Sequence, residues 1–246
     1  ELMLGTHLVD GRLRRSSRGG VVGRAAGVLA DHAWLVEGLL ALHQVTGADR
    51  WYDAALPVLE VARQHFADPD HTGAWFDTAN DAEMLFRRPA NATDSATPAG
   101  ASAIAGALLT AAALSGSEAY RSAAEASVAR AGVVPAKVPQ AAGHWLTTAE
   151  ALAHGPIQVA VIGVAGDAAR AALAARARWS APGGAVVLAG PPGTKHPMLA
   201  GRDLISGVAA AYVCRGFVCD RPVTSPDDLQ AQLRPEYSID SIDKTH

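Results

Sequence analysis

One stretch near the start of the chain has the pattern of two helices joined by a tight turn. Between Val28 and Leu42, apolar side chains recur every three or four residues, a spacing that keeps them on one side of a helix. Gly47 supplies the left-handed backbone at which many helices end, and a second helical pattern runs on to Phe66. Because the connection is so short, the two helices lie antiparallel. The sequence therefore predicts a helical hairpin.

The hairpin pattern returns further along the chain. Residues 46–55 and 115–124 align with glycine on glycine, an aromatic residue on an aromatic residue and Ala-Ala on Ala-Ala. The same spacing predicts helices over about 102–114, 118–130 and 140–153. A helical hairpin cannot bury its apolar face alone, so repeated hairpins indicate a stacked or ring-shaped array. We expect a mainly α fold, an incomplete (α/α)6 toroid, since these hairpins are fewer than a closed ring needs.

The remaining regions have other patterns. Residues 1–22 are expected to form a short helix or extended segment and a basic Ser/Gly loop, and a short β-hairpin is expected near 74–88, before a loop over 90–100. A strand over 157–164, a helix over 167–179 and a strand over 185–189 predict a βαβ unit with parallel strands. One or two strands over 209–218 and a helix over 226–233 follow. We therefore divide the chain into helical hairpins at 1–154, a small α/β module at 155–234 and a polar tail at 235–246.

The composition excludes several classes of protein. The 246 residues carry a net charge of −3 without a basic run, so nucleic acid is not an expected partner. No apolar run reaches the roughly 18 residues of a membrane span. Two cysteines are too few for a secreted disulfide scaffold, and we expect a cytoplasmic protein with no membrane partner. Because the sequence opens on Glu1 and leads directly into folded-chain patterns, we also expect it to be an interior piece of a longer polypeptide.

Five stretches of the sequence are similar, in this order, to one protein family. They are DGRLRRS, LADHAWLVEGLLALHQVTG, FDTANDAEMLFRRP, DSATPAGASA and AAYVCRGFVCDRPVTSPDDL. The chain resembles the C-terminal part of the thioredoxin-domain-containing family that includes bacterial YyaL and animal spermatogenesis-associated thioredoxin-like proteins. The resemblance implies an upstream thioredoxin-like domain and an (α/α)6 toroid like those of six-hairpin glycosidases and N-acylglucosamine 2-epimerases. It assigns no reaction.

The sequence departs from the family pattern in one loop. Where relatives tend to have Asp-x-Ala-x-Pro-Ser-Gly-Asn-Ser, this chain carries Ala99 and Ala101 in place of the serine and the asparagine. Two polar groups are therefore missing from a loop that the resemblance places at the toroid pocket, which weakens the case for an inherited activity.

In a toroid of helical hairpins, the inner helix ends and the inserted loops line a central pocket, so candidate site residues are sought there. At the start of the first helix, His32 is a candidate general acid or base, with Asp31 or Glu37 as its carboxylate partner. The alternative is that Asp31 caps the helix and His32 belongs to the core.

A second group of candidates comes from the inserted hairpin and the loop after it. Two carboxylates, Asp77 and Asp94, and the guanidinium of Arg88 on one rim would suit glycoside hydrolysis or sugar epimerisation. Alternatively, an ion pair between Arg88 and Asp94 fixes the loop. The aromatic residues Trp34, Trp75 and Phe76 would stack on a sugar ring or, more commonly for aromatics, belong to the core. The catalytic candidates are Asp31, His32, Asp77 and Asp94, and the substrate-binding candidates are Trp34, Glu37, Trp75 and Arg88.

No cofactor and no metal site is expected. Residues 190–195 lack the ending of a phosphate loop, residues 163–167 lack dinucleotide-binding spacing, and no Cys/His spacing fits zinc. On one continuous strand, Cys214 and Cys219 would point to opposite faces, whereas a turn at Arg215-Gly216 would return them to one face. We expect buried, unreactive cysteines, because free cysteines are commonly buried. A redox role would require the two sulfurs to approach bonding distance.

Two hypotheses for function follow. The first is a carbohydrate-active or carbohydrate-binding domain for a small sugar, with glycosidase- or epimerase-like chemistry if the protein is an enzyme. The second is a non-catalytic scaffold that positions a thioredoxin-like domain or the missing N-terminal part of the protein, or that binds a protein partner. Lost polarity at Ala99 and Ala101 favours the second hypothesis, and clustering of the candidate side chains around one cavity would favour the first.

Overall fold

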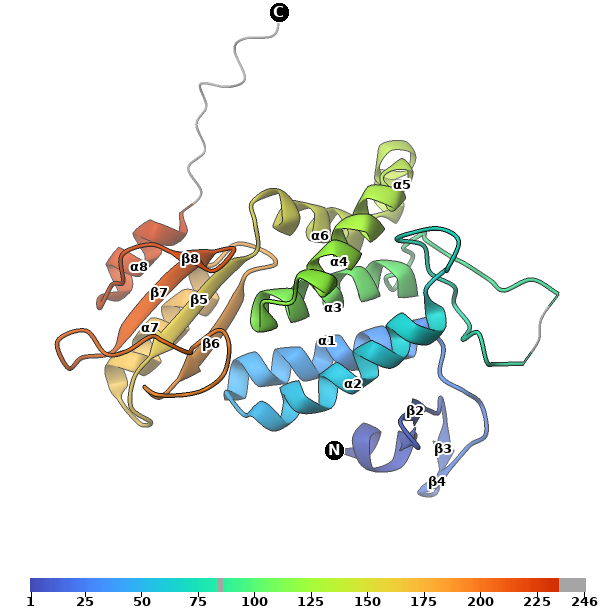
Figure 1. Ribbon diagram of the computed structural model, residues 1–246, viewed down its shortest axis with the longest axis horizontal. Coiled ribbons are helices and arrows are strands. Elements are labelled where there is room, and N and C mark those ends of the chain that lie inside the picture. The colour runs from blue at the N-terminus through green and yellow to red at the C-terminus, as the bar shows by residue number, and fades with distance from the viewer. Residues whose placement is uncertain (84–85, 235–246) are drawn as a thin grey trace, which may run out of the picture.

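Two antiparallel helical hairpins, stacked on each other, form the larger part of the molecule (Figure 1). The computed structural model describes residues 1–83 and 86–234. Helices α1 (Leu29–Thr46) and α2 (Asp49–Phe66) make the first hairpin, and α3 (Gly100–Ser115) and α4 (Glu118–Ala131) make the second. Gly47 and Gly116 end α1 and α3 with φ values of 67° and 76°, which glycine adopts without steric cost. Both predicted hairpins and both glycine turns are confirmed.

The helices are arranged in two layers. Helix α1 packs against α3, and α6 (Gly143–Ala153) packs against the other side of α3, while α2 and α4 cover one face of this inner row. The central helix α3 is alanine-rich and buried along nearly all of its length, so its neighbours approach closely. The short helices α5 (Val133–Lys137) and η2 (Pro139–Ala141) lead from α4 into α6. The fold is therefore mainly α, and the described helices form a layered array that does not close into a ring.

A small α/β part follows the helices. Strands β5 (Ile157–Ile162), β6 (Val186–Gly190), β7 (Ala210–Arg215) and β8 (Val218–Cys219) form one sheet in the order β6-β5-β7-β8. Strand β6 is parallel to β5, to which helix α7 (Ala168–Ser180) connects it, whereas β7 is antiparallel to β5 and β8 to β7. The predicted βαβ unit is confirmed, as is the last helix, α8 (Pro226–Leu233).

The sheet is buried on both faces. Alternate residues of β5 serve two cores: Val159 and Val161 belong to the core that includes Leu173 of α7 and Leu229 of α8, while Ile162 joins the core of the helical hairpins. Alternation of side chains along a strand produces this division. It also explains why β5 is apolar apart from Gln158, as strands covered on both faces mostly are.

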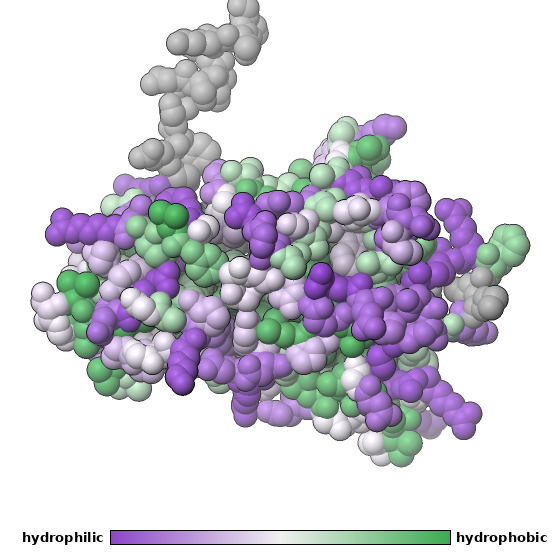
Figure 2. Space-filling view, viewed as in Figure 1, coloured by the Kyte–Doolittle hydropathy of each residue, from purple (hydrophilic) through white to green (hydrophobic). Residues whose placement is uncertain are grey.

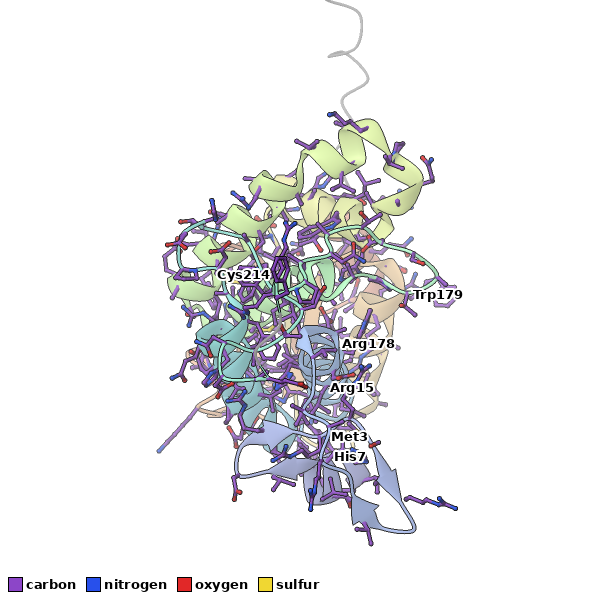
Figure 3. The ribbon with its side chains drawn as sticks, turned by 90° about the vertical axis from the view of Figure 1, so that its right-hand side faces the viewer. Met3, His7, Arg15, Arg178, Trp179 and Cys214 are labelled. Atoms are coloured by element: carbon purple, nitrogen blue, oxygen red, sulfur yellow. A yellow bond between two sulfur atoms is a disulfide. The ribbon has the colours of Figure 1, made fainter. Side chains whose placement is uncertain are left out.

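The N-terminal segment forms a π-helix, η1 (Met3–His7), and two small antiparallel ribbons (Figures 1 and 3). The ribbons pair β1 (Leu8–Val9) with β2 (Arg12–Leu13) and β3 (Ser17–Arg18) with β4 (Val21–Val22). Leu13 is buried in the helical core, and Arg12 Nη1 lies 2.6 Å from Asp81 Oδ2. These contacts attach the segment to the helices, where the sequence predicted only a short element and a loop.

The predicted β-hairpin near 74–88 is wrong for the described residues of that stretch, none of which lies in a named strand. Backbone groups there bond to other parts of the chain: Phe76 N–H donates to Phe66 O at 2.8 Å, and Asp77 O accepts from Leu29 N–H at 2.9 Å. The chain therefore crosses the end of α2 and the start of α1, and the Asp77 N–H donates to Pro89 O at 2.7 Å without forming a named strand pair. Met84 and Leu85, in the expected second arm, and the expected polar tail at 235–246 lie outside the described residues.

The expectation of two buried, unreactive cysteines is also wrong. A disulfide joins Cys214 of β7 to Cys219 of β8, and Cys219 is exposed. The turn between the strands places the two residues directly opposite each other, which is the arrangement that the sequence left open.

The surface is polar over most of the face shown in Figure 2, where apolar residues form separate patches. Trp179, at the end of α7, is the most exposed of the five tryptophans, with 90% of its surface accessible (Figure 3). Among the described residues, no helix combines the length and the apolar character needed to cross a membrane.

Candidate functional site

The inner row of helices has one side that neither α2 nor α4 covers. We call this side the free face and define it by Trp34, Glu37 and Val45 of α1, Gly106 of α3 and His144 of α6. Helix α1 is apolar around most of its circumference, so burying one side against α2 and α3 leaves Trp34 and Val45 accessible, at 41% and 66%. Exposed apolar residues beside a carboxylate make this face the candidate site.

Glu37 and His144 converge at the centre of the free face, above Gly106. A Cβ atom on residue 106 would lie 2.8 Å from His144 Nε2 and 2.9 Å from Glu37 Oε1. The two groups thus occupy the space that the missing side chain leaves, and a residue larger than glycine would displace them. Trp34, one turn before Glu37, stands beside them, with its ring centroid 5.7 Å from that of His144.

Among the described residues, no ion pair or side-chain hydrogen bond neutralises Glu37 or His144. His144 Nε2 is buried and has no hydrogen-bond partner among the described residues. Burial raises the pKa of Glu37 to about 7, and burial also lowers the pKa of His144, an effect that the charge of Asp94 opposes. At neutral pH, Glu37 is therefore divided between its acid and base forms, while His144 is neutral. A pair of titratable groups shifted in this way is suited to accept and return a proton.

Asp94 positions His144 and is not free for catalysis. It is buried, and its Oδ2 accepts the backbone N–H of His144 at 2.9 Å. Its Oδ1 accepts the Ala99 N–H at 2.9 Å and the Ser102 hydroxyl at 2.5 Å. Asp94 thereby joins the first turns of α3 and α6. The predicted ion pair of Asp94 with Arg88 is wrong: Arg88 donates to the carbonyls of Thr78 and His65 and lies 4.0 Å above the ring of Phe76.

The contacts of Asp31 and His32 match the structural alternative. Asp31 Oδ2 accepts the Val28 N–H at 2.8 Å at the start of α1 and lies 3.0 Å from Arg15 Nε. His32 is buried, donates from Nδ1 to Val28 O at 2.9 Å and packs against Phe66. Burial lowers its pKa, so it is neutral at pH 7. These interactions fix the beginning of the helix and give neither residue a place on the free face.

Asp77 and Trp75 lie in the segment that crosses the helix ends. Asp77 Oδ2 accepts the Asn91 N–H at 3.2 Å, and burial raises the pKa of this carboxyl. Trp75 is buried and donates from Nε1 to Ser127 Oγ at 2.9 Å. It borders a cleft of about 330 Å³ on the outer side of the helices. No hydrogen bond or ion pair joins the side chains of Asp31, His32, Asp77, Arg88 and Asp94 to one another, and a pocket lined by all five stays a prediction.

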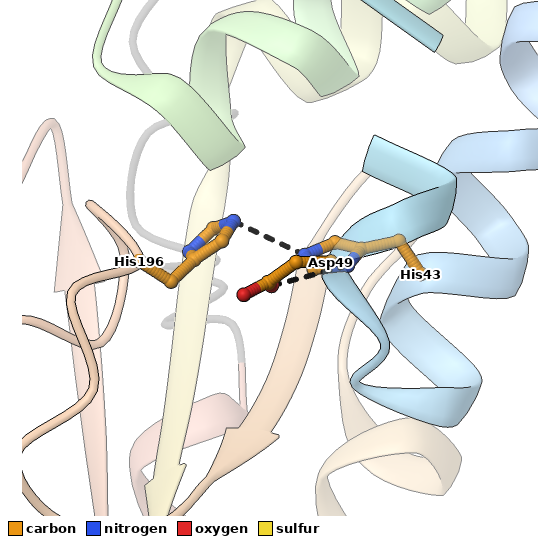
Figure 4. A group of neighbouring side chains, drawn as sticks. All are labelled: His43, Asp49 and His196. Carbon is orange, nitrogen blue, oxygen red and sulfur yellow. Dashed lines mark hydrogen bonds and ion pairs between the residues drawn. The ribbon is translucent and has the colours of Figure 1, made fainter. Parts of the chain in front are cut away.

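A cluster that the sequence analysis missed joins the first hairpin to the α/β part (Figure 4). His43 Nε2 lies 3.1 Å from His196 Nε2, and the exposed carboxylate of Asp49 lies 4.0 Å from His43 Nδ1. The Met198 N–H donates to His196 Nδ1, so a neutral His196 carries its proton on Nε2 and donates it to His43. His43 then donates from Nδ1 to Ala48 O at 3.2 Å.

These hydrogen bonds argue against a metal at the cluster, although the ligand atoms of His43, Asp49 and His196 all lie within 4.8 Å of one another. A cation between the two Nε2 atoms would require His196 to lose its Nε2 proton while Nδ1 accepts the Met198 N–H. The imidazole would then carry no proton at either nitrogen. The cluster is therefore a neutral, hydrogen-bonded histidine pair that fastens the loop after β6 to α1.

The histidine pair predicts a loss of stability in acid. Burial, and to a lesser extent the nearby His43, lower the pKa of His196 to about 4 from 6.5. The unfolded chain therefore binds this proton more tightly than the folded chain does. Its contribution is complete above pH 6.5 and is lost as the pH falls towards 4, amounting to about 3 kcal/mol of the free energy of unfolding. Urea unfolding between pH 7.5 and 4 measures it.

The control for this pH dependence is His196→Gln. Burial raises the pKa of Glu37, so protonation of that carboxyl stabilises the folded chain as the pH falls and opposes the histidine effect. The difference between the wild type and His196→Gln isolates His196, and it should shrink as the pH falls from 6.5. A difference that is the same at every pH would contradict the hydrogen-bonded neutral pair. His154→Gln, at the exposed histidine that directly follows α6, should leave the profile unchanged.

Comparison of the chain with protein-family models and with curated protein sequences finds no match.

Proposed function

We propose that this chain is a carbohydrate-active domain in which Glu37 and His144 transfer protons at a small sugar bound on the free face. The observation that carries the proposal is their convergence above Gly106, where burial moves the pKa of Glu37 up and that of His144 down. Trp34 offers an exposed aromatic ring beside them, and aromatic faces are common platforms for sugar rings.

The residues at the site favour an isomerase-like reaction over glycoside hydrolysis. Hydrolysis by the usual route needs two carboxyl groups on either side of the scissile bond. The other candidate carboxylates, Asp77 and Asp94, accept backbone hydrogen bonds, from Asn91 and from Ala99 and His144 respectively. A carboxylate and a neutral imidazole that meet on one side of the sugar instead suit removal of a proton from a carbon next to a sugar carbonyl and its return on the same side to the neighbouring carbon. In this proposal Glu37 and His144 are the catalytic residues.

The same face also supports the second hypothesis, a docking surface for another domain. Besides Trp34 and Val45, helix α1 exposes 43% of Leu42, so apolar area extends beyond the carboxyl–histidine pair. In the proposed whole protein, further hairpins complete an (α/α)6 toroid over this area, and an upstream thioredoxin-like domain precedes them. These features and a cytoplasmic location rest on the sequence resemblance and composition and belong to the proposal.

Thermal unfolding in the presence of mono- and disaccharides tests the binding step. A sugar at 100 times its dissociation constant stabilises the folded chain by about 2.7 kcal/mol, which raises the midpoint of unfolding by several degrees. We expect one class of small sugar to give this shift and Trp34→Ala to abolish it. Trp179→Ala removes a more exposed tryptophan far along the chain and should retain the shift.

Two outcomes of the sugar experiment would contradict the proposal. If no sugar shifts the midpoint, for this chain and for the chain extended to its natural length, the carbohydrate hypothesis fails and the docking surface becomes the leading interpretation. A shift that survives Trp34→Ala would place the sugar elsewhere, with the cleft beside Trp75 as the next site to probe.

A further inference from the structure

The disulfide at the edge of the sheet joins two strands of one tight hairpin, unlike a disulfide that links distant parts of a core. Its two sulfurs belong to facing residues of a hairpin, with Cys214 paired to Cys219 in the register of β7 and β8. The turn is formed by Gly216 and Phe217, which have φ values of 57° and 66°. Such a two-residue turn with positive φ fits the twist of paired strands and holds the cysteines opposite each other. The pair therefore forms by local pairing and remains adjacent if the bond opens.

The two cysteines differ in access to solvent. Cys214 is 1% exposed, whereas Cys219 lies on the exposed edge strand β8. A thiol from solvent therefore reaches Cys219 first. Exposed disulfides are the labile ones, while structural disulfides resist exchange.

A single positive charge lies against both sulfurs. Arg202 Nη2 is 3.1 Å from Cys219 Sγ and 3.3 Å from Cys214 Sγ, and Arg202 Nη1 donates to Met198 O at 2.7 Å, which holds the guanidinium in place. An arginine stays charged in proteins, and a neighbouring cation stabilises a thiolate over a thiol. The guanidinium thus faces whichever sulfur becomes negatively charged when the bond opens.

We propose that Cys214 and Cys219 are a reversible redox pair that exchanges with external thiols through Cys219, with Arg202 stabilising the thiolates. In the first step, an external thiolate attacks Cys219 Sγ, the Cys214–Cys219 bond breaks, and Cys214 leaves as a thiolate beside Arg202. In the second step, another external thiolate attacks the external sulfur of the mixed disulfide that Cys219 carries. Cys219 is released as a thiolate, the two external thiols become one disulfide, and their two protons pass to solvent or to the cysteines. The protein gains two electrons and the thiols lose two.

The hairpin also connects this pair to the helices. Gln158 of β5 accepts the Phe217 N–H through Oε1 at 3.0 Å and donates from Nε2 to Ala113 O, in the last turn of α3, at 2.6 Å. The Phe217 ring packs over Gly116, where a Cβ would lie 3.2 Å from it. Opening the disulfide therefore loosens the support for the C-terminal end of α3, and the oxidised chain should be the more stable form.

The test uses this chain in its folded state and glutathione. The protein is equilibrated at a series of ratios of reduced to oxidised glutathione, quenched with an alkylating reagent and weighed by mass spectrometry. We expect the pair to pass completely and reversibly between disulfide and dithiol, with the chain folded throughout by circular dichroism. A pair that stays oxidised in excess reduced glutathione until urea unfolds the chain is a structural disulfide and overturns the proposal. So does a pair of thiols that excess oxidised glutathione never joins.

Single-cysteine and arginine variants test the assigned roles. Cys214→Ser should form a mixed disulfide with oxidised glutathione at least about ten times faster than Cys219→Ser, because Cys219 is the accessible sulfur. Arg202→Met should raise the pH midpoint of Cys219 alkylation in the reduced chain towards the ordinary value of about 8.5 and slow exchange at pH 7, whereas Arg202→Lys should keep the lower midpoint. Equal rates of mixed-disulfide formation in the two serine variants would show that Cys219 is not the point of exchange. The same pH midpoint of alkylation with arginine, lysine and methionine at position 202 would show that Arg202 does not stabilise the thiolate.

Discussion

Glu37→Gln is expected to slow proton exchange at a bound sugar by about 10²- to 10⁴-fold without weakening sugar binding. Removal of a positioned general acid or base has an effect of this size, and glutamine keeps the shape of the side chain while losing its ability to take up a proton. The measurement is the incorporation of deuterium from D2O into the sugar that stabilises the wild type, followed by NMR. His144→Gln should have a similar effect, because the two groups act in sequence on one proton. The matched control is Glu150→Gln, at an exposed glutamate of α6, which should exchange at the wild-type rate.

Gly106→Ala tests the same site through its geometry. The added methyl group would occupy the space where Glu37 Oε1 and His144 Nε2 meet and push them apart, and displacements of about 1 Å at a reacting group cost about 100-fold in rate. Gly38→Ala, also within a helix but with nothing within 4 Å of the new atom, should stabilise the chain by about 0.5–1 kcal/mol and leave exchange intact. If Gly106→Ala behaves like Gly38→Ala in both respects, Glu37 and His144 are not a catalytic pair.

The helical part of the fold was predictable because local patterns determine it. The apolar spacing of α1 and α2, the glycines that end α1 and α3, and the proline at the start of α8 each act within a few residues. The segment before Asp77 was mispredicted for the opposite reason. Its strand-like composition is real, but its backbone groups bond to Phe66 at the end of α2 and to Leu29 at the start of α1, contacts that depend on how the segment packs across the helix ends.

The candidate site was predicted in part. Trp34 and Glu37 were identified because they stand on the helix that anchors the fold, although no sequence signal connects Glu37 with His144. Their meeting depends on how α1, α3 and α6 pack and on the glycine between them. A search for glycine at an inner-helix position, with titratable residues on both flanking helices, would have found the pair. The loop acids were misassigned because sequence alone does not distinguish a carboxylate that faces a pocket from one that accepts backbone N–H groups.

Asp94→Ala is expected to lower the stability of the chain strongly, because this carboxylate holds two helix starts together. The variant would leave the buried N–H groups of Ala99 and His144 without an acceptor, while the Ser102 hydroxyl retains a bond to Ala99 O. Each unsatisfied buried donor costs about 1–3 kcal/mol, and bonds to a charged group are at the upper end, so we expect a loss of about 3–5 kcal/mol in the free energy of unfolding. Urea unfolding followed by circular dichroism measures it.

The controls for Asp94→Ala separate stability from chemistry. Asp53→Ala, at an exposed position of α2, should change stability by less than about 0.5 kcal/mol. The stability loss of Asp94→Asn should lie between those of Asp53→Ala and Asp94→Ala, because the amide oxygen still accepts one set of hydrogen bonds whereas the amide nitrogen accepts none. A loss below about 1 kcal/mol for Asp94→Ala would show that this carboxylate does not join α3 to α6. Because the same bond positions His144, reduced activity in Asp94→Ala would report a displaced catalytic histidine, and only Glu37 and His144 variants that keep wild-type stability test the chemistry itself.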